Sequence, residues 1–341
     1  MDGKRIRIGV IGAGGIANSV HLPSLRDIEH VDLAAICDLR LDKAQAAAQT
    51  FGAGRTRAYW DMYEMLDKET LDGVLVLVEP DRLFRAAKDV MMKGLPVLME
   101  KPAGISAYQA HSLARISRER GVLCAVAMNR RHVPLVQKVL HHMRSVTDIT
   151  QVDGLFYKNS DIQHSWDYAS AFGTDGIHAL DLVRYMAGGE VTACSTVIGR
   201  FSGSAVDNAW VSIMRFDNGV LGTLRSNYQT GARVHTFGVH GPGASAYISL
   251  GFGGAECEAT ILYNKGGAMY SLASGGVGGV DREVLDGKAI AGSSAFHVYY
   301  GYKQENEDFI NAIQMGTDPL CTVEDAAQSM ELAEKLLTNV I

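Results

Sequence analysis

The sequence lacks several features that would point to particular classes of protein. Basic residues are not in excess: 32 Lys and Arg stand against 38 Asp and Glu, a net charge of -6, which argues against nucleic acid or an anionic membrane surface as a partner. No apolar run approaches the ~20 residues that span a bilayer. The apolar stretch after the basic N-terminus, Ile8 to Ile11, is too short for a signal peptide. The expected partner is a small molecule.

The cysteines also form no pattern that would indicate a disulfide framework or a metal site. The five cysteines are odd in number and scattered, and none forms a CxxC pair, which favours a reducing compartment over a disulfide framework. We therefore expect a cytoplasmic protein. A hydrophobic fraction of 47% indicates a globular chain, and 341 residues are too many for one comfortable core, so two domains are expected.

The first motif is a glycine turn between a short apolar strand, Ile6 to Ile11, and a helix-like stretch. Gly12 permits a tight turn, Gly14 lets backbone N–H groups approach a pyrophosphate, and Ala17 is small enough for close packing of helix on strand. This context favours a dinucleotide site, although a glycine turn without a ligand is the alternative. The candidate cofactor contacts here are Gly12, Gly14, Gly15 and Ile16.

An acidic residue follows the next strand, Val31 to Cys37. Asp38 lies roughly where an acid meets the adenosine ribose 2'-OH, which favours NAD over NADP. Arg40 leaves NADP open, because an arginine at this place can accommodate a 2'-phosphate. Asp38 could instead be a solvated acid before the helix expected at 42–49.

Apolar strands and helix-like stretches then alternate up to about residue 129, which predicts a parallel sheet covered on both faces. Ligands of such sheets bind beyond the carboxyl ends of the strands. Glu100, Lys101 and Pro102 occupy one of these ends. After about Val126 the pattern changes to strands of period-two character joined by glycine turns such as 217–219 and 241–243. The glycine-rich segment 266–277 could be a mobile loop or further turns.

Several of these segments together resemble the glucose-fructose oxidoreductase, inositol dehydrogenase and MocA (Gfo/Idh/MocA) family of dehydrogenases. The resemblance implies an α/β fold: an N-terminal Rossmann dinucleotide-binding domain, placed at 1–124, and a C-terminal α/β domain at 125–341 with a large, mostly antiparallel open sheet, often used for oligomerisation. The motifs that carry it are GAGGIA (12–17), EKP (100–102), NRR (129–131), GIHALDL (176–182) and the closing patterns at 305–313 and 322–337.

Lys101 is the first candidate catalytic residue. Oxidation of a carbinol needs a base for the hydroxyl proton while the hydride passes to nicotinamide, and a lysine amine can take that proton. Lys101 is similar to the family lysine that touches the reacting hydroxyl, so it is also a candidate contact of substrate and cofactor, with Glu100 beside it. The alternative is a surface lysine in a strand-end turn. The family resemblance also implies that the bond before Pro102 is often cis.

The second candidate cluster runs from Thr174 to His178. If the chain is helical from Gly176, Asp175 and His178 share a face, so the carboxylate could orient the imidazole toward substrate. His178 is therefore the second candidate for proton transfer or substrate binding, with Asp175 as its catalytic partner. The family pattern DxGxH places the acid four residues before the histidine, where this chain has Thr174. Either Asp175 replaces that acid from the next position, or Thr174 contributes a hydroxyl contact. Arg184 could form a structural ion pair with Asp181 three residues before it.

Other polar residues flank the expected cleft. Arg131, Lys158, Asn159 and His164 could line a pocket for a polyol, with Lys158 suited as a strand-end cation, or they could be ordinary surface residues. A metal is not expected, because the spacing of acids and histidine around 175–181 matches no zinc pattern and hydride transfer needs no Lewis acid.

The function that these observations favour is an NAD(P)-dependent oxidoreductase acting on a sugar, cyclitol or related polyol, where the substrate class is implied by the family resemblance. Two alternatives stay open. One is a nucleotide-sensing regulatory protein that keeps the fold without turnover, and the other is a hydrolase of the same family that uses NAD transiently. The resemblance and an open apolar sheet predict a homodimer or homotetramer.

Overall fold

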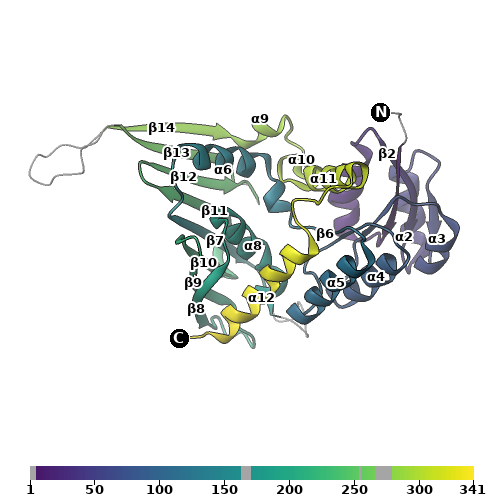
Figure 1. Ribbon diagram of the computed structural model, residues 1–341, viewed down its shortest axis with the longest axis horizontal. Helices are drawn as coiled ribbons and strands as arrows, with labels where there is room; N and C mark the ends of the chain where they lie inside the picture. Colours follow the sequence, from purple (N-terminus) through teal and green to yellow (C-terminus); the bar gives the residue numbers. More distant parts are fainter. Residues whose placement is uncertain (1–4, 163–169, 253–254, 266–278) are drawn as a thin grey trace, which may run out of the picture. The chain divides into compact units, whose positions relative to one another are not determined.

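A computed structural model describes residues 5–162, 170–252, 255–265 and 279–341. The chain forms two compact units (Figure 1): Met1–His132 with Ala295–Glu334, and Val133–Ser294 with Lys335–Ile341. His164 and the glycine-rich segment 266–277 lie outside the described residues.

The first unit is built on a parallel sheet that has six strands in the described part of the chain. Their order is β3-β2-β1-β4-β5-β6, with the first strand of the sequence in the middle. Helices cover both faces, and the strands are therefore apolar on both sides, as expected for a parallel sheet. The strands are β1 (Ile6–Ile11), β2 (Val31–Cys37), β3 (Arg57–Tyr59), β4 (Gly73–Val76), β5 (Val97–Met99) and β6 (Cys124–Val126).

The connecting helices begin and end at residues suited to those places. The Ser106 hydroxyl caps α5 by accepting from Gln109 N, and Gly121 ends the same helix with φ 62°. Pro80 stands in the first turn of α4, where its missing N–H costs nothing. The elements are η1 (Ala17–His21, a π-helical turn), α1 (Leu22–Arg26), α2 (Leu41–Phe51), α3 (Met62–Lys68), α4 (Pro80–Met92), α5 (Ala107–Arg120) and η2 (Asn129–His132).

The chain returns to the first unit near its end, through α10 (Phe296–Tyr299), α11 (Tyr302–Met315) and most of α12 (Val323–Thr338). Phe309 and Ile310 of α11 are fully buried in the same core as Ile8 of β1. Gly73 leaves room for this helix, because a Cβ there would stand 2.6 Å from Ile313 Cδ1.

The contacts thus divide the chain differently from the expected domains 1–124 and 125–341. The first unit continues to residue 132 and regains 295–334. The physical reason is the apolar face of α11, which completes the core of the Rossmann sheet rather than that of the second sheet.

The second unit holds a large, mostly antiparallel sheet, which confirms the expected architecture. Its eight described strands run in the order β14-β13-β12-β11-β7-β10-β9-β8, and β7 with β10 is the parallel pair. Gly219 and Gly243, at φ 87° and 82°, lie in the expected turns. The strands are β7 (Gln151–Asn159), β8 (Val191–Gly199), β9 (Ala209–Phe216), β10 (Leu221–Asn227), β11 (Gln229–Gly241), β12 (Ala244–Leu250), β13 (Cys257–Lys265) and β14 (Gly279–Asp286).

Helices cover one face of this sheet (Figure 1): α6 (Pro134–Val146), α8 (Ile177–Ala187) and α9 (Gly287–Ala291). The short α7 (Ala171–Thr174) precedes α8 and contacts it. Helix α8 packs on β7 and β10. Gly154 allows its close approach, since a Cβ there would stand 2.9 Å from Val183 Cγ2.

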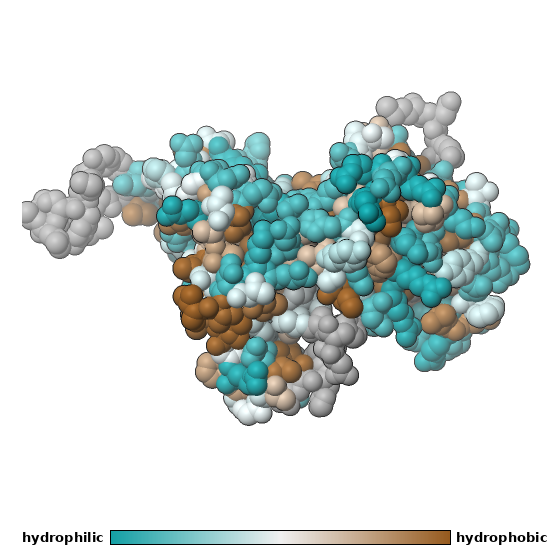
Figure 2. Space-filling view, turned by 60° about the horizontal axis from the view of Figure 1, so that its bottom comes forward, coloured by the Kyte–Doolittle hydropathy of each residue, from teal (hydrophilic) through white to brown (hydrophobic). Residues whose placement is uncertain are grey.

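The opposite face of the sheet is open. Ile213, Tyr247 and Val284 belong to one cross-strand row of this face and are each about half exposed. Figure 2 shows hydrophobic residues gathered on the surface of the second unit. In the middle of the same row, the Asp153 carboxylate accepts from Thr223 Oγ1 at 2.6 Å and lies 3.2 Å from His240 Nε2.

Candidate functional site

The glycine turn joins the carboxyl end of β1 to the following helix. Gly12 has φ 103°, and a Cβ there would stand 2.3 Å from the Leu77 carbonyl oxygen, so this position requires glycine. Its N–H donates to Cys37 O at 2.7 Å, which ties the turn to the end of β2. Beyond the turn the surroundings open, because a Cβ at Gly14 or Gly15 would meet no protein atom within 4 Å. These two glycines present their backbone to free space, as a phosphate cradle requires.

Asp38 connects the end of β2 to the glycine turn. Its Oδ2 accepts from Ala13 N at 2.8 Å and its Oδ1 from Arg40 N at 2.9 Å. The Arg40 guanidinium turns to Asp42, with Nη2 2.8 Å from Oδ2 in an exposed pair. The structure therefore brings together the candidate cofactor contacts of the glycine turn with Asp38 and Arg40.

The second motif forms a turn at the end of β5. Glu100 N donates to Val76 O at 2.9 Å, and the Lys101–Pro102 bond is cis, as the resemblance implied. Glu100 is nearly buried and Lys101 half-buried. The turn follows β5, which lies between β4 and β6, at the same edge of the sheet as the glycine turn.

A buried histidine, His21, contacts the Glu100 side chain of this turn. His21 has no exposed surface, and its Nε2 lies 3.1 Å from Glu100 Oε1 while its Nδ1 lies 3.2 Å from Asn306 Oδ1. The Tyr302 ring meets the His21 ring edge to face at 5.8 Å. Burial alone would raise the pKa of the Glu100 carboxyl, but the hydrogen bond with His21 and the charges of His21 and Lys101 hold it below its ordinary value.

Sequence reasoning missed His21, Asn306 and Tyr302. The closing pattern at 305–313 was noticed as part of the resemblance, but it carried no role. Nothing in the sequence alone connects residue 21 with residues 100 and 306.

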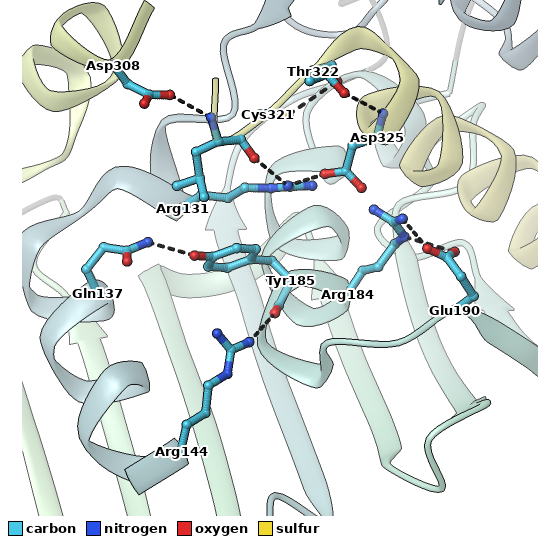
Figure 3. Close-up of polar contacts among 11 residues, drawn as sticks. Arg131, Gln137, Arg144, Arg184, Tyr185, Glu190, Asp308, Cys321, Thr322 and Asp325 are labelled. Atoms are coloured by element: carbon cyan, nitrogen blue, oxygen red, sulfur yellow. Dashed lines mark hydrogen bonds and ion pairs between the residues drawn. The ribbon is translucent and has the colours of Figure 1, made fainter. Parts of the chain in front are cut away.

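Arg131 lies in the first unit and anchors the start of α12 (Figure 3). Its guanidinium forms an ion pair with Asp325 and donates to Leu320 O at 3.3 Å. Thr322 caps the helix by accepting from Asp325 N at 3.2 Å. These contacts give Arg131 a structural part, and its contact with substrate stays a prediction.

In the second unit, three side chains meet at the start of α8. The Asp175 carboxylate forms an ion pair with Lys158 from β7 and accepts from the Tyr228 hydroxyl at 2.7 Å. The Lys158 ammonium also lies over the Phe156 ring, 4.6 Å from its centre. The structure thus brings Lys158 and Asp175 together and adds Tyr228, which sequence reasoning missed, because it follows β10 more than fifty residues after Asp175.

The neighbouring candidates lie on the same short segment. Gly176 is the residue before α8, so the expectation of a helix from this point is confirmed. The Thr174 hydroxyl donates to Ser170 O at 3.0 Å, and His178 stands in the first turn of the helix. The orientation of His178 by Asp175 stays a prediction. Arg184 pairs with Glu190, with Nη2 2.6 Å from Oε1 (Figure 3).

A parallel sheet of order 3-2-1-4-5-6 with a glycine turn on its first strand, joined to a unit with a large antiparallel sheet, defines a two-unit dinucleotide-binding protein. Residues 6–128 match the model of the oxidoreductase family with an NAD-binding Rossmann fold, and residues 143–247 match the GFO/IDH/MocA C-terminal domain. The chain belongs to the Gfo/Idh/MocA family of oxidoreductases, which confirms the resemblance.

Individual proteins are similar over parts of the chain. The rhizopine catabolism protein MocA of Rhizobium meliloti is 27% identical over 55% of this chain and 59% of its own length. D-apiose dehydrogenase of Paraburkholderia graminis is 26% identical over 66% of this chain and 61% of its own length. The chain thus matches less than two thirds of either relative. The crystal structure of a dehydrogenase from Chromobacterium violaceum superposes with a TM-score of 0.86 at 18% identity, covering 98% of this chain and 95% of that one.

Across the described residues, the helices are too short or too polar to traverse a bilayer. All five cysteines lie among the described residues, and no disulfide joins any of them.

Proposed function

We propose that the protein is an NAD(P)-dependent oxidoreductase that transfers a hydride between the nicotinamide and a CH–OH group of a sugar, cyclitol or related polyol. The observation that carries this proposal is the Glu100–Lys101–Pro102 turn at the same sheet edge as the glycine turn. The family and the similarity to D-apiose dehydrogenase support the class of substrate.

The residues at the sheet edge fit a dinucleotide. The backbone of Gly14 and Gly15 is open to a pyrophosphate, and the Asp38 carboxylate lies beside the turn where a ribose hydroxyl can donate to it. Glu100 and Ile16, which belong to the two turns at this edge, would be further cofactor contacts. When bound, the cofactor accepts or supplies the hydride at its nicotinamide ring.

The chain's own residues then handle the proton and hold the substrate. Lys101 would take the hydroxyl proton during oxidation and return it during reduction. In the second unit, His178 and Thr174 would contact the substrate. Asp175 would contribute a carboxylate whose charge Lys158 balances and which accepts a hydrogen bond from the Tyr228 hydroxyl.

Asp38 supports a preference for NAD, because its carboxylate would repel a 2'-phosphate. The Arg40–Asp42 pair supports the same preference, since it satisfies the guanidinium that a 2'-phosphate would otherwise attract. We also propose a cytoplasmic location, because five cysteines without a disulfide accord with a reducing compartment.

We also propose that the protein forms a homodimer or homotetramer, with a second copy covering the open face of the eight-stranded sheet. The exposed apolar side chains of that face, including Ile213, Tyr247 and Val284, would be removed from water by such contact. Ile213→Lys should shift the sedimentation coefficient toward the monomer. A wild-type protein that sediments only as a monomer at micromolar concentration would contradict the proposal.

The test of the activity is a panel of sugars and inositols, each with NAD and with NADP, in which absorbance of the reduced nicotinamide is followed. The proposal expects turnover with at least one of these compounds. A flat trace with tight cofactor binding would favour a regulatory protein. Release of an aglycone from a glycoside without net NADH would favour the NAD-dependent hydrolase.

A further inference from the structure

The buried histidine beneath the Glu100–Lys101 turn faces two acceptors. His21 Nε2 lies 3.1 Å from a Glu100 carboxylate oxygen, and His21 Nδ1 lies 3.2 Å from Asn306 Oδ1. The orientation of the Asn306 amide is fixed by its other end, because Nδ2 donates to the Tyr302 carbonyl at 2.9 Å. The oxygen of this amide must therefore point at His21.

A neutral imidazole has one N–H and one acceptor nitrogen, so it can satisfy only one of these two oxygens. The imidazolium donates from both nitrogens and satisfies both. Since His21 has no exposed surface, no bulk water is available to relieve a mismatch. Glu100 supplies the opposite charge, and a buried cation beside a carboxylate is the arrangement in which such a charge is tolerated.

The second oxygen of Glu100 is also engaged. Glu100 Oε2 accepts from Lys101 N at 3.0 Å, so the carboxylate is held between the His21 ring and the backbone N–H of Lys101. This hydrogen bond fixes the position of the Lys101 backbone nitrogen. A substitution of His21 would therefore alter the position of Lys101 through the Glu100 carboxylate, which contacts both residues.

His21 occupies the last residue of the π-helical turn that follows the glycine motif, and Asn306 belongs to α11. The network therefore connects the glycine turn, the end of β5 and the returning helix within one unit. The charged and titratable groups around it include Glu100 and Lys101 on the turn, Tyr300 after α10, Tyr302 and Glu305 on α11, and Arg130 on η2.

We infer that His21, doubly protonated between Glu100 and Asn306, is a positioning residue that sets the place of Lys101 for proton transfer. The inference rests on the proposed oxidoreductase function. It assigns His21 an effect on kcat and leaves cofactor and substrate affinity to other residues.

The first test is His21→Gln, which keeps a donor for Glu100 but removes the charge and the second N–H. With the best substrate of the panel, kcat should fall about 10- to 100-fold, since small misplacements of a catalytic group cost that much. KM and the dissociation constant of NAD should change less than about twofold. His111→Gln is the matched control, because His111 Nε2 also lies 3.1 Å from a glutamate, Glu331, but on the surface between α5 and α12. It should leave kcat unchanged.

The second test does not depend on turnover. In protein labelled with ¹⁵N-histidine, the His21 ring should give the two similar ¹⁵N shifts of an imidazolium at pH 7.5, and Asn306→Leu should convert it to a neutral tautomer. In uniformly ¹⁵N-labelled protein, His21→Gln should also move the Lys101 amide resonance, while His111→Gln should not.

A neutral His21 ring in the wild type would overturn the inference, as would His21→Gln with kcat within about twofold of the wild type. If the panel gives no turnover with any compound, the proposed oxidoreductase function fails. In that case the ring shifts and the Lys101 amide still decide whether His21 positions the turn.

Discussion

The glycine turn makes a quantitative prediction about Gly12. In Gly12→Ala, the new Cβ meets two separate penalties. A φ of 103° disfavours any residue with a Cβ, at a cost of about 1–2 kcal/mol. The Cβ would also stand 2.3 Å from Leu77 O and 2.8 Å from Leu77 C, which are backbone atoms that cannot rotate away. Overpacking of this kind costs a further ~1–3 kcal/mol.

Gly54→Ala separates the two penalties, because Gly54 has φ 77° and open space around its Cβ position. The Gly54→Ala variant should therefore carry only the conformational penalty. For a unit of this size each kcal/mol shifts Tm by about 2–4 °C. Thermal unfolding followed by circular dichroism should therefore place Gly12→Ala at least about 2 °C below Gly54→Ala, with weaker NAD binding in Gly12→Ala alone. Equal Tm values for the two variants would refute the argument that the Leu77 carbonyl excludes a side chain.

Three further predictions concern Lys101, Asp38 and Asp153. Lys101→Ala should lower kcat by ~10²- to 10⁴-fold while NAD affinity measured by fluorescence survives; near-normal kcat would reduce the lysine to a turn residue. Asp38→Ser should relax the preference for NAD in competition titrations. A wild type that prefers NADP would instead indicate that Arg40 binds the 2'-phosphate of the ribose. Burial alone would raise the pKa of Asp153, but hydrogen bonds from His240 and other neighbours hold this pKa at about 2. The Asp153 carboxylate therefore stabilises the fold above about pH 4, and this stabilisation is lost as the pH falls toward 2. The stability gap between wild type and Asp153→Asn in urea titrations should shrink over that range, and a constant gap would contradict this.

Local patterns predicted the first sheet well. The strands at Ile6–Ile11 and Val31–Cys37 were placed at their observed bounds, because a continuous apolar run between turn residues is typical of a buried parallel strand. The helix that the argument about Asp175 and His178 assumed from Gly176 is also present, beginning at Ile177.

Long-range contacts set the limit of this reasoning. The return of α11 to the first unit depends on which apolar face fills which core, and its periodicity alone fits either unit. The same limit applied to the candidate site: Lys158 and Asp175 were proposed singly, and the ion pair between them required the fold.

The place of α11 in the first core has a consequence for the order in which the protein can be made. The last strand of the first sheet ends at Val126, but Phe309 and Ile310, which complete its core, emerge from the ribosome some 180 residues later. At about 5–20 residues per second, the nascent chain carries an unfilled apolar face for roughly 10–35 s. Residues 133–294, which make up most of the second unit, are synthesised within that interval, so we expect this part to fold before the first unit closes. Chains that stop before residue 295 should be prone to capture by chaperones and to aggregation.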